Sequence, residues 1–303
     1  MADGNSSSRS PVSRYGDLVG VALPLAATVL AMLGFQVGAS LAKQLFPAVG
    51  IVGTVTLRLT LSAVMLIALT RPWRNWPRRA PLLSLLGLGA SVTAAVLFFY
   101  LAIGRLPQGM AIALQFLGPL SVAVLGSRRL RDLLWAGLAV LGGWLLLGAG
   151  FSLKGVDPLG VFWALCAATG WASYILSGRA ASQAFGNSAA ALAIGIAALI
   201  VLPFGASQAA IVFQKPGLIP LALLVAVVSA ALPFSLEMYA LPRVPARTFA
   251  VFTSLEPAFG VLAGLLLLGE KLSLGQMAGI TLVISAAAGA AWSSSARPAP
   301  PLD

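Results

Sequence analysis

Long apolar runs recur along the whole chain and constrain its fold more than any other feature. A helix needs about 20 consecutive, mainly apolar residues to cross the hydrocarbon core of a bilayer. The sequence predicts an all-α integral membrane protein with ten transmembrane helices, because ten runs near this length are separated by short breaks rich in Pro, Gly and Arg. The runs are 18–41, 51–70, 81–103, 108–126, 133–151, 158–178, 188–206, 217–240, 246–268 and 274–293.

The charge content agrees with burial in lipid. Only 9% of the 303 residues are charged and 59% are hydrophobic, whereas about 25% of the residues of a soluble domain are charged. The formal net charge of +11 suggests nucleic acid at first sight. The cations fall between the apolar runs rather than on one basic face, so we expect a lipid bilayer as partner and no nucleic acid.

The distribution of Lys and Arg predicts the orientation. If the N-terminus is cytoplasmic, 13 of the 19 cations fall in cytoplasmic segments. Five fall in the outer loops, and these are Lys43, Arg105, Lys154, Lys215 and Lys271. Cytoplasmic loops carry an excess of Lys and Arg, so both termini are expected in the cytoplasm. Residues 1–16 and 294–303 are polar and Pro-containing, and we expect them to be disordered tails.

Weak internal similarity indicates a repeat. Gly34 matches Gly170 at an offset of 136 residues, and Arg-Leu-Pro at 105–107 matches Arg-Val-Pro at 243–245 at an offset of 138. The second offset also pairs Pro119 with Pro257.

Each repeat contains five of the expected helices, over 17–152 and 153–293. Five is an odd number, so the second copy enters the membrane from the opposite side. Inverted repeats of this kind are typical of secondary transporters, whose substrate site lies near the bilayer midplane between the halves.

Glu256 lies inside an apolar run, directly before Pro257. An ionised carboxylate at the bilayer centre costs about 2.5–3.5 kcal/mol on insertion scales, and a proline within a helix removes one backbone donor. Two such costs side by side indicate a site in which Glu256 binds a substrate ammonium or a proton. A structural ion pair or a protonated, hydrogen-bonded acid is the alternative.

Two further ionisable residues lie inside apolar runs. Glu237 is close in sequence to Arg243 and Arg247, and either can pair with it. Arg58 can pair with Glu256, contact a substrate carboxylate or extend to the interface. We therefore treat Glu237, Arg58 and Glu256 as candidates for a proton-binding or ion-paired group.

Polar and aromatic residues within the runs complete a candidate cavity. Gln115 lies one turn before Pro119, so under the repeat it occupies nearly the position that Thr253 and Glu256 occupy in the second half. For the aromatic residues, simple packing between helices is the alternative. The candidate substrate-binding residues are Gln36, Ser40, Tyr100, Gln115, Trp163, Trp171, Tyr239 and Glu256, and Pro119 and Pro257 are candidate hinges.

Missing residue types exclude several activities. The chain has one cysteine, Cys166, and no histidine, which removes a disulfide framework, imidazole metal sites and Ser-His catalysis. It also lacks a phosphate-binding Gly-rich lysine motif and a helical zinc-protease motif. We therefore expect neither an enzyme nor an ATP-driven pump, and no metal or cofactor.

Several segments resemble one known family. Gly38–Lys43 (GASLAK), Leu114–Leu120 (LQFLGPL), Pro233–Leu241 (PFSLEMYAL), Arg247–Gly260 (RTFAVFTSLEPAFG) and Leu268–Leu272 (LGEKL) resemble the EamA type of the drug/metabolite transporter superfamily. Within it they are similar to the bacterial threonine/homoserine and aromatic amino acid exporters. The first repeat has Gly118 where the second has Glu256, so the two halves are not equivalent.

The resemblance implies a bacterial inner-membrane exporter of amino acids such as threonine, homoserine, methionine or aromatic amino acids. It would work as a monomer by alternating access, with the helices over 81–126 and 217–268 moving against the rest. Export driven by a proton gradient and passive export both fit. The alternative is a multidrug or nucleotide-sugar transporter on the same fold.

Overall fold

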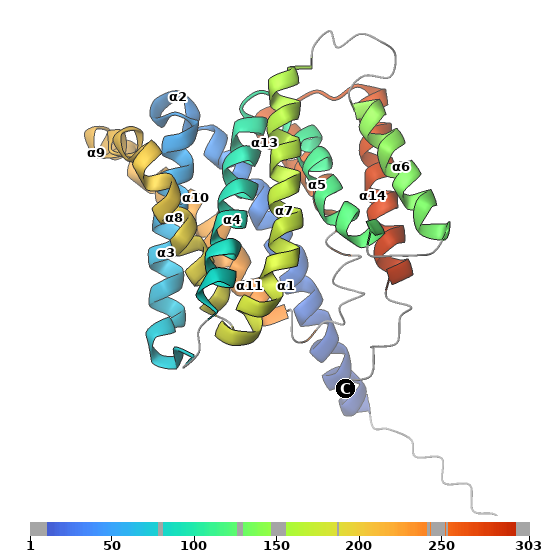
Figure 1. Ribbon diagram of the computed structural model, residues 1–303, viewed down its shortest axis with the longest axis horizontal. Coiled ribbons are helices and arrows are strands. Elements are labelled where there is room, and N and C mark those ends of the chain that lie inside the picture. The colour runs from blue at the N-terminus through green and yellow to red at the C-terminus, as the bar shows by residue number, and fades with distance from the viewer. Residues whose placement is uncertain are drawn as a thin grey trace, which may run out of the picture.

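The computed structural model describes residues 11–77, 81–125, 130–146, 156–186, 188–240, 243, 252 and 254–294. All regular structure in these residues is helical (Figure 1). The α-helices are α1 (Pro11–Lys43), α2 (Phe46–Val49), α3 (Ile51–Thr70), α4 (Leu82–Ile103), α5 (Gln108–Leu125), α6 (Leu130–Leu146), α7 (Pro158–Phe185), α8 (Ser188–Ala209), α9 (Ile211–Gln214), α10 (Ile219–Ala226), α11 (Leu232–Ala240), α13 (Glu256–Leu268) and α14 (Leu274–Ser294). Two 3₁₀ turns, η1 (Pro72–Asn75) and η2 (Pro216–Leu218), and a π-helical turn, η3 (Val227–Ala231), join them.

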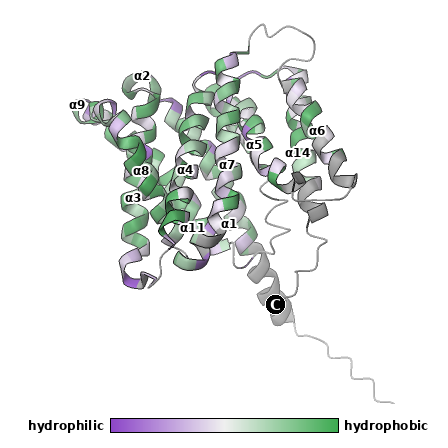
Figure 2. Cartoon of the chain, in the orientation of Figure 1, coloured by the Kyte–Doolittle hydropathy of each residue, from purple (hydrophilic) through white to green (hydrophobic). Residues whose placement is uncertain are grey.

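Length and composition qualify six helical segments of the described chain to cross a membrane. They are 23–43, 51–74, 82–103, 158–178, 188–214 and 216–237, and shorter apolar helices cover 108–122, 256–268 and 274–289. Large apolar side chains are exposed on many of these helices, for example Leu83, Phe204 and Leu266. Hydrophobic residues prevail along most of the described helices (Figure 2). Soluble monomers rarely expose apolar surface on this scale. The chain is therefore an all-helical, multi-pass membrane protein.

Some predicted boundaries change. The helix α1 begins at Pro11, so the second part of the expected tail 1–16 is helical. Proline suits the first turn of a helix, because the N–H that it lacks would have no partner there. At the other end α14 reaches Ser294. Residues 1–10 and 295–303 lie outside the described residues, as do Pro242, Pro245 and Arg247 of the expected turn before the ninth run.

Helices that are distant in sequence pack against each other across the bundle. The helix α4 packs on α7 and α8, α3 packs on α8, and α6 packs on α14 at one side of the molecule (Figure 1). The helix α5 lies between α7 and α13, and α1 contacts η3, α11 and α13. This arrangement surrounds the middle of the bundle with segments from both halves of the sequence.

Small residues allow the closest of these contacts. A Cβ atom on Gly170 would overlap the backbone of Ala95 on α4, and one on Gly118 would overlap the carbonyl of Ala168 on α7. Membrane helices associate through such small residues, because lipid supplies little hydrophobic force between them. These glycines therefore fix the separation of α4, α5 and α7 around the central space.

Candidate functional site

A cavity of about 260 Å³ lies in the middle of the bundle. Its walls come from α1, α3, α4, α5, α7, α11 and α13. Most of the lining is apolar or aromatic, including Phe35, Phe99, Phe116 and Phe234. A few polar groups face the same space, as is usual for a small-molecule site.

Most of the residues expected at a substrate site line this cavity. They are Gln36, Arg58, Tyr100, Gln115, Pro119, Trp171, Glu237 and Glu256. Seven helices carry them. Six of these helices lie in separate apolar runs of the sequence, and α11 ends another run. The structure therefore brings one ionisable or amide group from each of α1, α3, α5, α11 and α13 to a single space.

Ser40, Trp163 and Tyr239 do not belong to the cavity lining. The Ser40 hydroxyl is buried and donates to Oε1 of Gln108 at 2.9 Å. Trp163 stacks on Phe98, with ring centroids 5.4 Å apart, between α7 and α4. Tyr239 is exposed, two residues after Glu237 and therefore turned away from it on α11. The expected hinge Pro257 is buried beside the site rather than in its wall.

Glu256 accepts a hydrogen bond from the opposite half of the chain. Nε2 of Gln36 donates to Oε1 of Glu256 at 2.9 Å. Glu256 is also the first residue of α13, with Pro257 next to it. A carboxylate in the first turn of a helix interacts favourably with the helix dipole. The side chain keeps acceptor capacity for a ligand, because one carboxylate accepts several hydrogen bonds.

Arg58 is buried, and its guanidinium donates hydrogen bonds to the π-helical turn η3. Nε of Arg58 donates to Oγ of Ser229 at 2.7 Å, and Nη2 donates to the Ser229 carbonyl at 2.8 Å. Pro233 lies four residues after Ser229 and has no N–H for that carbonyl. The guanidinium of Arg58 supplies the hydrogen bond that this carbonyl loses, at the π-helical turn η3. An ion pair with Glu256, one of the three roles that the sequence leaves open for Arg58, is not among the ion pairs of the described residues.

Glu237 is not paired as the sequence suggested. Nη1 of Arg243 donates to the Tyr239 carbonyl at 2.7 Å, and its guanidinium lies 4.3 Å from the centre of the Tyr239 ring. The other expected partner, Arg247, lies outside the described residues. The described ion pairs are Lys43–Glu270 and Arg105–Asp157, so Glu237 faces the cavity without a described cation.

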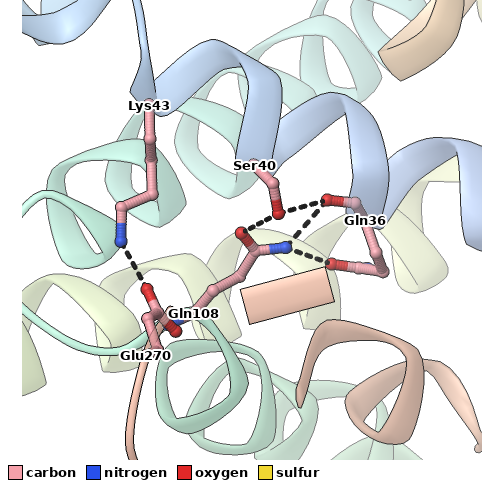
Figure 3. Close-up of polar contacts among 5 residues, drawn as sticks. All are labelled: Gln36, Ser40, Lys43, Gln108 and Glu270. Carbon is pink, nitrogen blue, oxygen red and sulfur yellow. Dashed lines mark hydrogen bonds and ion pairs between the residues drawn. The ribbon is translucent and has the colours of Figure 1, made fainter. Parts of the chain in front are cut away.

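A polar network leads to the cavity residue Gln36 (Figure 3). Nζ of Lys43 contacts Oε1 of Glu270 at 2.6 Å, and Oε2 of Glu270 accepts from the backbone N–H of Gln108 at 2.7 Å. The amide nitrogen of Gln108 donates to the Gln36 carbonyl at 2.9 Å. The network therefore runs from the end of α1 to Gln36, which holds Glu256.

Two glycines make the position of Glu270 available. Gly269 has a φ of 63°, in the left-handed region that favours glycine, and the following N–H of Glu270 donates to the Gly264 carbonyl at 3.0 Å. A Cβ on Gly264 would overlap the Glu270 carboxylate. The chain thus turns back, and Glu270 reaches the first N–H of α5. Lys43, which the charge distribution assigns to an outer loop, is its ion-pair partner, with only 20% of its side chain exposed.

A second ion pair at loop ends is more exposed. Nη1 of Arg105 donates to Oδ2 of Asp157 at 2.7 Å, and the two side chains are 45% and 35% exposed. The hydrogen bond from Arg105 lowers the pKa of Asp157 below its ordinary value. This pair joins the loop after α4 to the start of α7 and takes no part in the cavity.

Sequence reasoning missed four residues of this site. Tyr174 lines the cavity and makes an edge contact with Trp171, at a centroid distance of 5.3 Å. Gln108 and Glu270 sit at helix ends, where polar residues are ordinary. Ser229 had a usable signal, because the rule that connects a helix proline to the carbonyl four residues earlier points from Pro233 to it.

The arrangement defines a class of protein. A multi-pass helical bundle contains a small central cavity lined by two carboxylates and one guanidinium, and a polar network reaches its lining residue Gln36. Ionisable groups that face a cavity inside a bundle mark a substrate or ion pathway. These are the features of a membrane transporter rather than an enzyme.

Comparisons with known proteins give the family. The profile of the EamA-like transporter family matches residues 158–292. The threonine/homoserine exporter RhtA of Escherichia coli (strain K12) is 45% identical over 267 residues, which cover 88% of this chain and 90% of that protein. RhtA of Salmonella typhimurium (strain LT2) gives the same identity and coverage. The chain belongs to the EamA-like transporter family of the drug/metabolite transporter superfamily.

One solved structure has the same fold. It is titled only as the crystal structure of a protein and is 20% identical in sequence, with a TM-score of 0.53. The match covers 88% of this chain and 98% of that one. At this identity the likeness concerns the arrangement of helices alone.

Proposed function

We propose that the protein exports threonine and homoserine from the cytoplasm by alternating access. The relatives that share 45% of their residues with it over most of its length are threonine/homoserine exporters. The observation that carries the proposal is the central cavity, in which Glu256 and Arg58 supply groups of opposite charge from α13 and α3. An amino acid is a zwitterion and needs both.

The size of the cavity favours a single amino acid. Sites for drug-sized ligands usually have about 300–1,000 Å³, whereas this cavity has about 260 Å³. A nucleotide sugar is larger and anionic, and two carboxylates in the wall would repel its phosphates. The multidrug and nucleotide-sugar alternatives are therefore less well supported than a small zwitterion.

The proposal includes two inverted five-helix repeats, over 17–152 and 153–293. Matched close contacts support them. Gly34 on α1 lies against Pro233 on α11, and Gly170 on α7 lies against Ala95 on α4. The offset of 136 residues carries Gly34 to Gly170, and the offset of 138 carries Ala95 to Pro233. The offset of 138 comes from other residues, so its agreement at Ala95 and Pro233 supports a two-fold relation.

The packing of whole helices has the same symmetry. Under the repeat, α4 on α7 corresponds to η3 and α11 on α1, and both contacts are extensive. Under the repeat α3 corresponds to α8, and α6 corresponds to α14. Each of these pairs is in contact, so the repeat maps each contact onto itself. Such a bundle can rock about a central site while its contacts exchange between equivalent arrangements.

The polar network gives the proposed cycle an outer gate. With both termini in the cytoplasm of a bacterium and the chain in the inner membrane, Lys43, Gln108 and Glu270 lie at the outer ends of their helices. Their contacts tie α1, α5 and the α13–α14 connection together. Opening to the outside requires these contacts to break. We place the hinges at Pro119 and Pro257, and we take the monomer as the working unit.

Two carboxylates in one cavity suggest how export is coupled. Glu237 and Glu256 both line the space, and like charges repel unless a cation or a proton lies between them. The substrate ammonium and a proton are then competitors for the same carboxylates. Exchange of one for the other would drive export with the proton gradient.

Transport into liposomes tests the proposal. The purified full-length chain is reconstituted, and uptake of labelled threonine and homoserine is measured with and without a pH gradient. Uptake of both amino acids above protein-free liposomes is expected. Absence of uptake in both conditions, with intact reconstituted protein, would overturn the proposed function.

A further inference from the structure

We propose that Gln115 reads the side-chain hydroxyl of the substrate and makes the cavity selective for hydroxylated amino acids. The inference rests on the proposed function and assigns the basis of its selectivity to one residue. It starts from an amide group that the fold buries and leaves without a partner.

Gln115 is 6% exposed and lines the cavity from α5. Its Oε1 atom is buried and has no hydrogen bond with the residues that the structure describes. An unsatisfied buried acceptor costs about 1–3 kcal/mol, and native proteins rarely tolerate one without a reason. Because Gln115 lines a space large enough for a small ligand, a ligand is the natural source of the missing partner.

The other polar groups of the cavity are better matched to the other two ends of an amino acid. An ammonium prefers a carboxylate, and Glu256 and Glu237 provide two. A carboxylate prefers a cation, and Arg58 is the cation in the lining. Its Nε and Nη2 atoms donate to Ser229, which leaves Nη1 to donate to a ligand. The guanidinium also lies 5.3 Å from the centre of the Tyr100 ring, which lines the same space.

This assignment leaves Gln115 for the side chain of the substrate. An amide both accepts and donates, and a hydroxyl does the same, so the two groups match whichever way the amide is turned. An aliphatic side chain would fill the space but leave Oε1 unpaired. A site built to bond a hydroxyl rejects the analogue without it for this reason.

The chain offers a matched control. The Thr60 hydroxyl on α3 is also buried and also lacks a hydrogen-bond partner among the described residues, but Thr60 is not part of the cavity lining. Removing it tests the general effect of deleting an unsatisfied buried polar atom. Removing the polar group should change the substrate preference only at Gln115.

The experiment is competition in liposomes that hold the full-length protein. Uptake of labelled threonine is competed with unlabelled threonine, homoserine, valine and 2-aminobutyrate. The last compound is both threonine and homoserine without the hydroxyl, and valine replaces the threonine hydroxyl by a methyl group. For the wild type we expect threonine and homoserine to compete about 10- to 100-fold better than either analogue, the range that an unpaired buried acceptor implies.

The substitution Gln115→Leu should weaken competition by threonine and homoserine and strengthen that by valine, so that the difference falls to about threefold or less. Thr60→Val should retain the wild-type preference. Gln115→Met serves the same purpose if the leucine variant does not fold.

Each outcome decides a separate point. If threonine is transported but 2-aminobutyrate competes equally well in the wild type, the hydroxyl is not read and the inference fails while the proposed function stands. If the wild type discriminates and both Gln115 variants keep that discrimination, Gln115 is not the reader. If no labelled threonine enters at all, the proposed function itself fails.

Discussion

Nε2 of Gln36 on α1 donates a hydrogen bond to Oε1 of Glu256 on α13 across 2.9 Å. The two residues are 220 positions apart and belong to different halves of the sequence. Gln36 is also bonded through its carbonyl to Gln108, which in turn bonds Glu270. The central carboxylate is thus connected to the ion pair at the end of the cavity.

This connection predicts the effect of Glu256→Gln. The amide has nearly the same shape and can still pair with Gln36, but it cannot hold a proton or attract an ammonium as a carboxylate does. Hydrogen bonds to charged groups contribute about 1.5–3 kcal/mol, so we expect apparent affinity for threonine to fall about tenfold or more. Dependence of uptake on the pH gradient should disappear. Liposome uptake at several threonine concentrations measures both quantities, and full pH coupling in the variant would show that the proton binds elsewhere.

The sequence predicted those site residues whose burial in lipid has a large free-energy cost. Glu256 beside Pro257 and Arg58 inside an apolar run are expensive in lipid wherever they face, and both line the cavity. Their partners were harder to foresee. Arg58 bonds Ser229, whose carbonyl lacks its usual helical partner because Pro233 has no N–H.

Side-chain direction and long-range pairing could not be predicted in the same way. Trp163 and Tyr239 are aromatic residues in apolar runs, as Trp171 is, but only Trp171 faces the cavity. The difference depends on helix rotation, which packing between helices sets. Lys43 and Glu270 each look like ordinary interfacial charges, and only the turn at Gly269 brings the carboxylate back to the lysine.

The difference between the repeats at Gly118 and Glu256 also has a packing cause, which leads to a prediction. A Cβ at position 118 would overlap the carbonyl of Ala168 on α7. Overpacking of this kind usually costs about 1–3 kcal/mol, so Gly118→Ala should lower the melting temperature of the purified protein. At Gly137 on α6, a Cβ would meet nothing within 4 Å, and Gly137→Ala should leave the melting temperature unchanged or raise it. Equal effects of the two substitutions would contradict the tight α5–α7 contact.

Arg58 gives a prediction about stability. Arg58→Lys keeps the charge but cannot bond both Oγ and the carbonyl of Ser229 with the same planar group. A buried acceptor left without a partner costs about 1–3 kcal/mol, so the variant should melt at a lower temperature. Thr60→Val on the same helix removes a hydroxyl that has no described partner and should be neutral or stabilising. If Arg58→Lys melts like the wild type, the bond to the π-helical turn contributes little.

The last prediction concerns the ion pair between Lys43 and Glu270. Lys43→Met should loosen the outer end of the cavity, since it removes a partly buried contact that joins α1 to the α13–α14 connection. A loss of about 1 kcal/mol shifts an equilibrium between closed and open states roughly fivefold.

The readout is a cysteine placed in the cavity wall by Ala39→Cys, in a background in which Cys166 is replaced by Ser. In intact cells, a membrane-impermeant thiol reagent should label this position several times faster in the Lys43→Met variant. Arg105→Ala, which breaks the exposed pair with Asp157, should leave the labelling rate unchanged. Equal labelling in all three proteins would show that Lys43 and Glu270 do not hold the outer end closed.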